Sequence, residues 1–367
     1  MNNAFVLSQF ILSITLTVAS LVFIQQTNFL NKFDVGYNAE NVVLFYLPSS
    51  ETDMHQTLRN KLEAESSIEK VGSGSVSPIN MGSTVASEDW GWDGLEYGTP
   101  VSIYRISSDH NYLDIFDISI LHGRNFYAAK SDSNKVVINE ELATLLNFDD
   151  PVGKVMRHGE DIFEIIGVVR NFHFQHLSNK IQPLYLTYSD NKNRMYVRFK
   201  QNSDENLNLV KKHFTQFYDT RFSYYYVESS LDEMYSNERK ISKAILIFTI
   251  VTIILSSIGL VGLITFNTES KMKEIGVRKV LGATISEIVI MLNKDIMKWF
   301  SIAFLISCIL SWLAMSRWLE DFAYRISLSW WIFATAGSII IMITILTISM
   351  QSSRAARKNP VDALRYE

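Results

Sequence analysis

Four stretches of the chain are apolar on every side of a helix and lack charged residues over almost all of their length. A membrane-spanning helix needs about 20 such residues, because the hydrocarbon core of a bilayer is about 30 Å thick. A helix buried in a large soluble core usually keeps a polar stripe, which these stretches lack. The pattern therefore predicts four transmembrane spans, at 4–24, 244–266, 296–316 and 326–350.

The first apolar stretch can also be read as a cleaved signal peptide. A signal peptide begins with a basic segment and has a shorter apolar part. Residues 1–3 include no basic side chain, and the apolar stretch that follows them is long. We therefore expect a membrane span there rather than a cleaved leader.

The residues between the first two spans have the pattern of a folded domain. Short runs of β-branched and aromatic residues predict strands at 42–47, 101–106, 136–138, 163–169, 184–188, 195–199 and 222–227. Apolar residues at helical spacing predict helices at 52–66, 139–146 and 204–218. The stretch 72–99 is rich in Gly and Ser and is expected to be a loop or a crossover. We expect an exoplasmic α+β domain over 25–243, whose last part, 230–243, is a stalk helix that continues into the second span.

Lysine and arginine in short loops mark the cytoplasmic side of a membrane protein. Six basic residues lie between 267 and 298, around the loop 267–295, and four more lie in the tail 351–367. The hairpin 317–325 has two basic and two acidic residues, which suits the opposite side. The predicted orientation places both termini in the cytoplasm and the domain 25–243 outside. That domain has a net charge of −8, which argues against nucleic-acid binding.

The sequence contains no motif for catalysis or for a cofactor. Gly153–Lys154 suggests a phosphate-binding loop, but Phe148 stands where the first glycine of that loop is required. His173 and His176 lack the cysteine or carboxylate pattern of a metal site, and the chain's single cysteine excludes an intrachain disulfide. The chain is therefore expected to be no enzyme and to hold neither a metal ion nor a cofactor.

The second span carries a group of small residues that predicts a helix contact. Ser256, Gly259 and Gly262 would let a neighbouring helix approach closely. No span has a charged residue at its centre, which argues against an ion or proton pathway through the bilayer.

The segment 271–284 (KMKEIGVRKVLGAT), which follows the second span, is the most informative part of the sequence. Its basic and apolar residues would lie on different sides of a short helix. Such a helix can bind membrane lipid through its basic side chains, or it can be the docking surface for a cytoplasmic partner. The residues alone leave both interpretations open.

This segment resembles the cytoplasmic loop of the FtsX-like, MacB-type permease family of ABC transporters, over Lys273–Thr284. Several other segments resemble the same family in the same order along the chain. These are 112–126 (YLDIFDISILHGRNF), 137–142 (VINEEL), 151–154 (PVGK), 165–184 (IIGVVRNFHFQHLSNKIQPL), 318–326 (WLEDFAYRI) and 351–367 (QSSRAARKNPVDALRYE). The resemblance thus covers nearly the whole chain.

The resemblance implies a permease subunit of the bacterial inner membrane that forms a dimer with a second permease half or copy. It implies a cytoplasmic ABC ATPase as partner, which would bind ATP and Mg²⁺ in place of this chain. An exporter of this kind would also work with a periplasmic adaptor and an outer-membrane channel. The residues implied to contact the ATPase are Lys273, Glu274, Ile275, Gly276, Val277, Arg278, Lys279, Leu281 and Gly282.

The family's outer region often has two lobes, which are expected here at 41–75 with 181–230, near the membrane, and at 76–180. MacB carries its ATPase in the same chain, whereas this chain begins just before the first span. Residues 5–37 instead resemble the start of the second half of long two-half permeases from Bacteroidota. We expect either a compact subunit that pairs with itself or one half of a longer permease.

The expected function is that of a permease subunit in an ABC exporter or mechanotransmitter. ATP hydrolysis by a separate ATPase would move the exoplasmic domain, which acts on a substrate outside the inner membrane. The alternative is a regulator of the FtsX type that transports nothing. It would use the same movement to activate a cell-wall hydrolase or to report a bound peptide.

Overall fold

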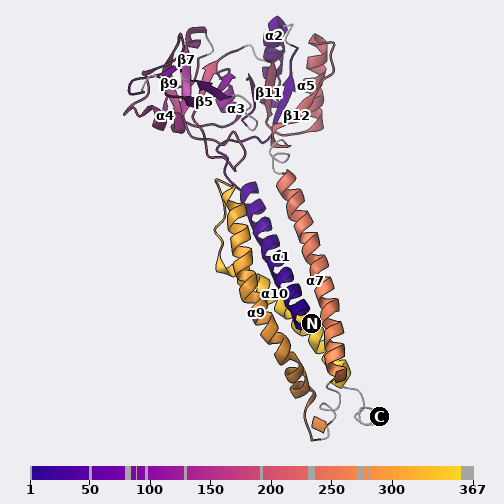
Figure 1. Ribbon diagram of the computed structural model, residues 1–367. Helices are drawn as coiled ribbons and strands as arrows, with labels where there is room; N and C mark the ends of the chain where they lie inside the picture. Colours follow the sequence, from indigo (N-terminus) through magenta and orange to yellow (C-terminus); the bar gives the residue numbers. More distant parts are fainter. Residues whose placement is uncertain are drawn as a thin grey trace. The chain divides into compact units, whose positions relative to one another are not determined.

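The structure is a computed structural model that describes residues 2–48, 52–78, 84–87, 89–95, 98–127, 130–190, 193–229, 236–270, 277–278 and 281–356. The chain divides into two compact units, which Figure 1 shows. The helical unit comprises Met1–Lys32 and Ser236–Glu367, and the outer unit comprises Phe33–Tyr235. The outer unit is therefore an insertion after the first helix of the helical unit.

The described part of the helical unit consists of four long helices. They are α1 (Asn2–Asn31), α7 (Ser236–Ser270), α9 (Ile285–Glu320) and α10 (Trp330–Ala356). Each is long and apolar enough to cross a membrane, so the predicted four-span layout is confirmed. The helices extend past the charge-free stretches, because their backbone hydrogen bonds do not depend on whether the side chains are polar. The predicted stalk thus lies in the same helix as the second span from Ser236 onward, and 230–235 lie outside the described residues.

Helix α1 is the most enclosed helix of this unit. Half of the residues in its apolar window are buried (50%), against 11% in the window of α7. It contacts each of the other three helices, and Figure 1 shows it between α7 and α9. Ile14 and Val18 of α1 lie in one apolar cluster with Leu260, Phe300 and Ile340. Much of the remaining surface of α7, α9 and α10 is apolar and exposed, as expected for helices that meet lipid or other membrane helices.

The outer unit contains two sheets, of which the smaller has four antiparallel strands in the order β12-β1-β11-β2. These strands are β1 (Val42–Tyr46), β2 (Ile68–Ser73), β11 (Arg194–Phe199) and β12 (Tyr224–Tyr226). The helices α2 (Thr52–Glu63) and α5 (Asp204–Phe217) contribute to one apolar cluster with this sheet. Phe45 of β1, Leu58 of α2 and Phe214 of α5 meet in that cluster.

The larger sheet has eight strands in the order β3-β5-β10-β7-β9-β8-β4, and β6 pairs with β9. The strands are β3 (Thr84–Ser87), β4 (Trp90–Gly91), β5 (Val101–Ser108), β6 (Ile120–Gly123), β7 (Lys135–Asn139), β8 (Val155–His158), β9 (Asp161–Val169) and β10 (Leu184–Tyr188). Two pairs are parallel, β5 with β10 and β7 with β9, so the sheet is mixed. The helix α4 (Glu140–Leu146) packs on it through Leu142 and Leu146.

One apolar core lies between the two sheets and joins them into a single unit. It contains Leu44 of β1, Tyr196 of β11 and Leu186 of β10. Tyr112 and Phe116, in and just after the short helix α3 (Tyr112–Ile115), fill the same core and are fully buried. The α+β fold that the sequence predicts for this part of the chain is confirmed.

The sheets correct the predicted division into lobes. The prediction places 181–230 with 41–75, but β10 (184–188) pairs with β5 and β7 in the larger sheet. Hydrophobic runs show that a strand is buried without showing which neighbour it pairs with, so this partition could not follow from pattern. The predicted loop or crossover at 72–99 also contains the short strands β3 and β4.

Candidate functional site

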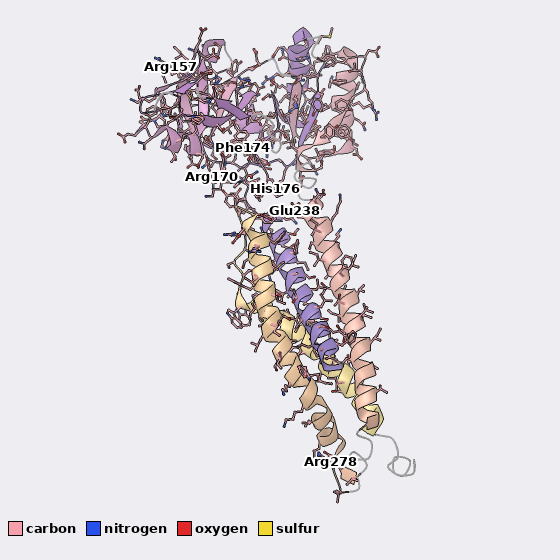
Figure 2. The ribbon with its side chains drawn as sticks, in the orientation of Figure 1. Arg157, Arg170, Phe174, His176, Glu238 and Arg278 are labelled. Carbon is pink, nitrogen blue, oxygen red and sulfur yellow. The ribbon has the colours of Figure 1, made fainter. Side chains whose placement is uncertain are left out.

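The predicted docking residues lie at the turn between α7 and α9, and the structure describes four of them. Val277 and Leu281 are 52% and 80% exposed, and Arg278 is exposed as well. Figure 2 shows Arg278 at the end of the helical unit where α7 ends and α9 begins. Lys273, Glu274, Ile275, Gly276 and Lys279 lie outside the described residues. The docking assignment therefore stays a prediction.

The described part of this turn has the hydrogen bonds of a helix C-terminus. The Leu281 amide donates to the carbonyl of Val277 (3.0 Å), and the Ala283 amide donates to the carbonyl of Arg278 (2.9 Å). Gly282 has a φ of +94°, which a residue with a side chain rarely adopts. The glycine thus ends the turn and redirects the chain toward α9.

Helix α9 starts directly after this turn with a capping box. The Thr284 hydroxyl accepts from the Glu287 amide (3.3 Å), and the Glu287 carboxylate accepts from the Thr284 amide (2.9 Å). The two bonds satisfy amides that the first turn of a helix leaves without partners. The glycine turn and the capping box therefore fix the backbone at the start of α9.

Hydroxyl pairs join α1 to α7 inside the bundle. The Ser13 and Ser256 hydroxyls are 2.8 Å apart, and those of Ser20 and Thr249 are 2.7 Å apart. Ser20 lies seven residues after Ser13 in α1, whereas Thr249 lies seven residues before Ser256 in α7. The two helices are therefore antiparallel, and their contact repeats every seven residues. The prediction from sequence did not include Ser13, Ser20 and Thr249. The sequence nevertheless shows hydroxyl side chains spaced seven residues apart in both spans.

The predicted packing residues of α7 differ in what they face. Ser256 bonds to α1, and a Cβ on Gly259 would lie 2.6 Å from Nε2 of Gln9, so both residues lie against α1. A Cβ on Gly262 would meet no described atom within 4 Å. The structure thus brings two of the three predicted residues to the α1 contact.

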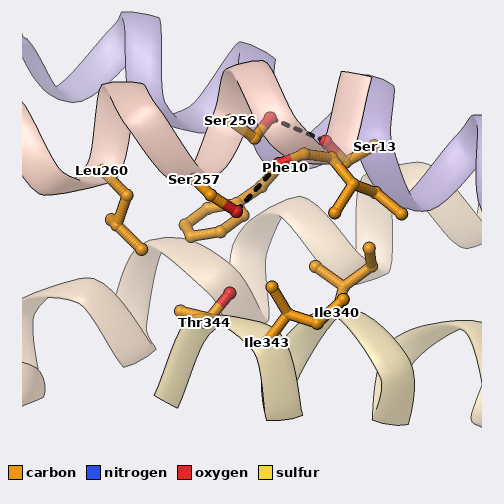
Figure 3. A pocket seen from close by; sticks show the side chains of 9 residues that line it. Phe10, Ser13, Ser256, Ser257, Leu260, Ile340, Ile343 and Thr344 are labelled. Atoms are coloured by element: carbon orange, nitrogen blue, oxygen red, sulfur yellow. Dashed lines mark hydrogen bonds between the residues drawn. The ribbon is translucent and has the colours of Figure 1, made fainter. Parts of the chain in front are cut away.

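A small cavity lies beside the Ser13–Ser256 pair, between α1, α7 and α10. Figure 3 shows Phe10, Leu260 and Ile343 around it, and the Thr344 hydroxyl points toward its centre. The cavity has about 20 Å³ of room for the centre of a water molecule, which is enough for about one water. It is too small for a transported substrate, so we treat it as part of the helix contact.

Gln26 joins α1 to the connection between α9 and α10. Its Nε2 donates to the carbonyl of Tyr324 (3.0 Å), and its Oε1 accepts from the Ile326 amide (2.9 Å). The Gln26 side chain is fully buried, and Phe23, one turn earlier, stacks on Trp318 with ring centroids 3.9 Å apart. α1 is therefore anchored to two different neighbours, α7 near its middle and the α9–α10 connection near its end.

Two buried arginines of the smaller sheet and its helices join the outer unit's two sheets. Arg59 of α2 donates to Asp109 (2.7 Å), which follows β5. Arg198 of β11 donates to the carbonyl of Ile115 (2.9 Å) and lies 2.8 Å from the carboxylate of Asp117. Burial raises the pKa of the Asp109 carboxyl, and the Arg59 charge opposes that rise.

Two comparisons with protein families account for most of the chain. The family described as the MacB-like periplasmic core domain matches residues 8–215. The chain belongs to this family. The family described as the FtsX-like permease C-terminal region matches residues 246–360. The resemblance seen in the sequence is thus confirmed, and the match places this MacB-type chain among the permease subunits of ABC transporters.

Three solved structures illustrate what this MacB-type chain is similar to. The periplasmic region of MacB from Actinobacillus actinomycetemcomitans is 14% identical, with a TM-score of 0.37, and the match covers 52% of this chain and 91% of that one. The extracellular domain of the noncanonic ABC-type transporter YknZ from Gram-positive bacteria is 16% identical (TM-score 0.35; 50% and 97% covered). A permease-protein domain from Porphyromonas gingivalis is 15% identical (TM-score 0.36; 51% and 89% covered). No curated protein matches the chain.

The MacB-type family implies a membrane subunit without catalysis of its own and a cytoplasmic ATPase as partner. In the described part of the chain, no three His, Cys, Asp or Glu side chains are grouped as a metal site requires. Of the two histidines considered for metal binding, His173 is buried, which lowers its pKa. The ring of His176 contacts the Ser178 hydroxyl through Nδ1 (2.8 Å).

Proposed function

We propose that this permease couples ATP hydrolysis by a separate cytoplasmic ATPase to movement of its outer domain, which acts on a substrate outside the inner membrane. The observation that carries the proposal is the continuity of α7. This helix begins at Ser236, next to the boundary of the outer unit, and ends at Ser270, next to the predicted docking segment. Its 35 residues correspond to a length of about 52 Å at 1.5 Å per residue.

A single helix of this kind transmits force because its backbone hydrogen bonds make it stiff along its axis. A partner that displaces the turn at Val277–Gly282 would push or tilt α7 from its cytoplasmic end. The same helix would then move the segment that enters the outer domain. The chain thus needs no catalytic group, since the ATPase supplies the energy and binds ATP and Mg²⁺.

The surface of α7 supports the second part of the proposal, which is pairing with a second permease half or copy. The window of α7 is only 11% buried within this chain, and the side chains of Ile247, Phe248 and Ile258 are more than half exposed. Lipid can cover such a surface, but a second permease would bury it and join the two moving helices. We therefore place α7 at the dimer contact.

The proposed orientation puts both termini and the Val277–Gly282 turn in the cytoplasm. The support comes from the basic residues around 267–298 and in the tail, which the positive-inside rule assigns to that side. The outer domain and the α9–α10 connection then lie on the exoplasmic side, which is the periplasm in a bacterium with two membranes. A periplasmic adaptor and an outer-membrane channel would contact the chain there.

Copurification with the partner ABC ATPase tests the docking assignment. The permease and a tagged ATPase are expressed together, and the permease recovered on the tag is measured for wild type, Arg278→Glu and Arg325→Glu. Arg325 is an exposed arginine in the connection between α9 and α10. Reversing its charge is therefore a control for the effect of charge reversal alone. We expect Arg278→Glu to lower recovery at least about fivefold, because a charge at a protein interface is replaced by its opposite.

Recovery of the Arg325→Glu variant should equal that of wild type, since the ATPase does not reach the opposite side of the membrane. Equal recovery of all three forms would remove the docking role from this turn. A loss with Arg325→Glu alone would reverse the proposed orientation. Thermal unfolding of each purified variant in detergent shows whether reduced recovery reflects lost folding.

A further inference from the structure

The edge of the larger sheet holds a cavity of about 460 Å³ that none of the roles above uses. Its walls come from three segments, which are the end of β4, the residue Phe148 after α4, and the start of β8. β4 pairs with β8 at only two positions in the described residues, Trp90 with His158 and Gly91 with Arg157. Among the described residues, the first half of β8 has no paired strand on the β4 side, and the hollow lies there.

Part of the wall of this cavity is apolar, and the core beneath holds that part in place. Trp92 and Phe148 are half-buried and pack against the apolar cluster under the sheet. Val155, at the start of β8, is 41% exposed and adds an aliphatic surface. Aromatic side chains fixed in this way form a preformed surface, and the volume lies in the range of small-ligand sites.

Charged side chains line the same cavity. Lys154 and Arg157 are both exposed, and neither forms an ion pair with a residue that the structure describes. Other arginines of the outer unit, such as Arg59 and Arg124, are paired with carboxylates. Asp93 supplies one carboxylate in the wall. A domain with a net charge of −8 thus places two cations and one carboxylate at an aromatic hollow, which leaves an excess of one positive charge there.

We propose that this cavity binds the C-terminal residue of a peptide whose last side chain is apolar or aromatic. The peptide carboxylate meets Lys154 and Arg157, and its last side chain packs on Trp92 and Phe148. Arginine and lysine form charge-assisted hydrogen bonds with carboxylates, which are stronger than neutral ones. Asp93 accepts from a peptide N–H group, a donor that a fatty acid lacks. The chemistry of the wall therefore favours a peptide end over a fatty acid.

Calorimetry on the detergent-purified full chain tests the proposal with three probes. Acetyl-Ala-Phe has a free carboxylate, and acetyl-Ala-Phe amide has the same shape without the charge. We expect the acid to bind at least about fivefold more tightly than the amide at low salt, and its affinity to fall as salt screens the cations. Inorganic phosphate, the third probe, should bind more weakly than the acid because it lacks an apolar part.

Variants of the wall assign the binding to this cavity. Arg157→Gln and Trp92→Leu should each weaken binding of the acid at least about fivefold. Arg221→Gln changes an exposed arginine of the same domain outside the cavity, and it should bind like wild type. Figure 2 labels Arg157 on the larger-sheet side of the outer unit. Its side chain is exposed, so we expect its replacement to leave the core intact.

Several outcomes would overturn the proposal. Equal affinity for the acid and the amide would exclude recognition of the carboxylate. Phosphate that binds as tightly as the acid would exclude a contribution of the aromatic walls to binding. Equal effects of Arg157→Gln and Arg221→Gln would place the binding elsewhere, and absence of heat with every probe would exclude the site. Unfolding curves that match wild type show that each variant is folded.

Discussion

Arg59 and Asp109 form a buried ion pair, in which Nη1 of Arg59 donates to Oδ2 of Asp109 at 2.7 Å. Arg59 belongs to α2, which packs on the smaller sheet, and Asp109 directly follows β5 of the larger sheet. The Ser73 amide of β2 also donates to Asp109 (2.7 Å), so a residue that follows a strand of the larger sheet is bound to the smaller sheet and to its helix. This pair and the shared core connect the two sheets.

Removing the carboxylate of Asp109 should destabilise the outer domain strongly. Asp109→Ala leaves the Arg59 charge buried and the Ser73 amide without its acceptor, which in comparable pairs costs about 3–5 kcal/mol. Glu63 still contacts Nε of Arg59 (3.0 Å), so we expect about 3 kcal/mol. Urea unfolding of the full chain, followed by circular dichroism in detergent, measures the loss.

The exposed pair between Lys70 and Asp114 is the control for this change. Its side chains are 38% and 51% exposed, so Asp114→Ala should cost no more than about 1 kcal/mol. Equal losses in the two variants would contradict the role given to burial. A small loss in both would mean that the shared core alone holds the sheets together.

Asp132 should make the outer domain sensitive to acid. Its buried carboxylate accepts from both Nη atoms of Arg124 (2.8 and 3.0 Å) and from the Tyr127 amide (2.8 Å). The hydrogen bonds from Arg124, more than the other contacts, hold the pKa of Asp132 well below its usual value of 3.8. The unfolded chain then binds the proton more readily, so this contribution is present above pH 4 and is lost as the pH falls through the lowered pKa.

Unfolding of wild type and Asp132→Asn at pH 7, 5, 4 and 3 checks this dependence. We expect the variant to be less stable by about 2 kcal/mol at pH 7, with the difference shrinking below about pH 4. Asp190→Asn, which changes an exposed carboxylate, should keep a constant difference from wild type. A difference for Asp132→Asn that grows as the pH falls would contradict the sign of the pKa shift.

Gln26 should contribute more to the stability of the helical unit than its neighbour Gln25. Gln26→Leu would leave the carbonyl of Tyr324 and the amide of Ile326 without their side-chain partner in a buried position. Each buried group left without a hydrogen bond lowers the free energy of unfolding by about 1–3 kcal/mol. If water reaches one of the two groups, the total loss should be about 2 kcal/mol. Gln25 is exposed, and Gln25→Leu should leave the melting temperature in detergent unchanged. Similar melting temperatures for the two variants would exclude the anchoring role.

Gly259 and Gly262 allow a matched test of the contact between α1 and α7. Gly→Leu increases helix propensity equally at both positions, so the difference between the two variants reports packing alone. At Gly259 the new side chain would meet Gln9, whose flexible end can yield to a Cβ but not to a whole leucine. We expect Gly259→Leu to be less stable than Gly262→Leu by about 1–3 kcal/mol in detergent unfolding. If Gly262→Leu were the less stable of the two variants, the contact between α1 and α7 at Gly259 would be contradicted.

Local pattern was sufficient for many elements of the outer domain. The runs predicted at 42–47, 184–188 and 195–199 agree with β1, β10 and β11 to within one residue at each end, because each is a continuous apolar strand. Strands β2, β6 and β8 were missed, since charged or polar residues and glycine interrupt their apolar positions. Their assignment depends on the strands that they pair with, which lie far away in the sequence.

The sequence by itself determined the four apolar helices, the place of the inserted domain and its α+β character. All of these depend on how apolar residues repeat over one helix or one strand, and that repeat is a local property. The resemblance to MacB-type permeases rested on short motifs and was also visible without a structure.

Only the tertiary structure decided which elements meet. It paired Ser13 with Ser256 across 243 positions of sequence, joined Arg59 to Asp109, and placed β10 in the larger sheet. The cavity beside Arg157 likewise needs three separate segments. A hydrophobic pattern records that a face is buried but not what buries it, because the burial of apolar surface is non-directional. Hydrogen bonds and ion pairs select the partner, and their geometry exists only once the chain has folded.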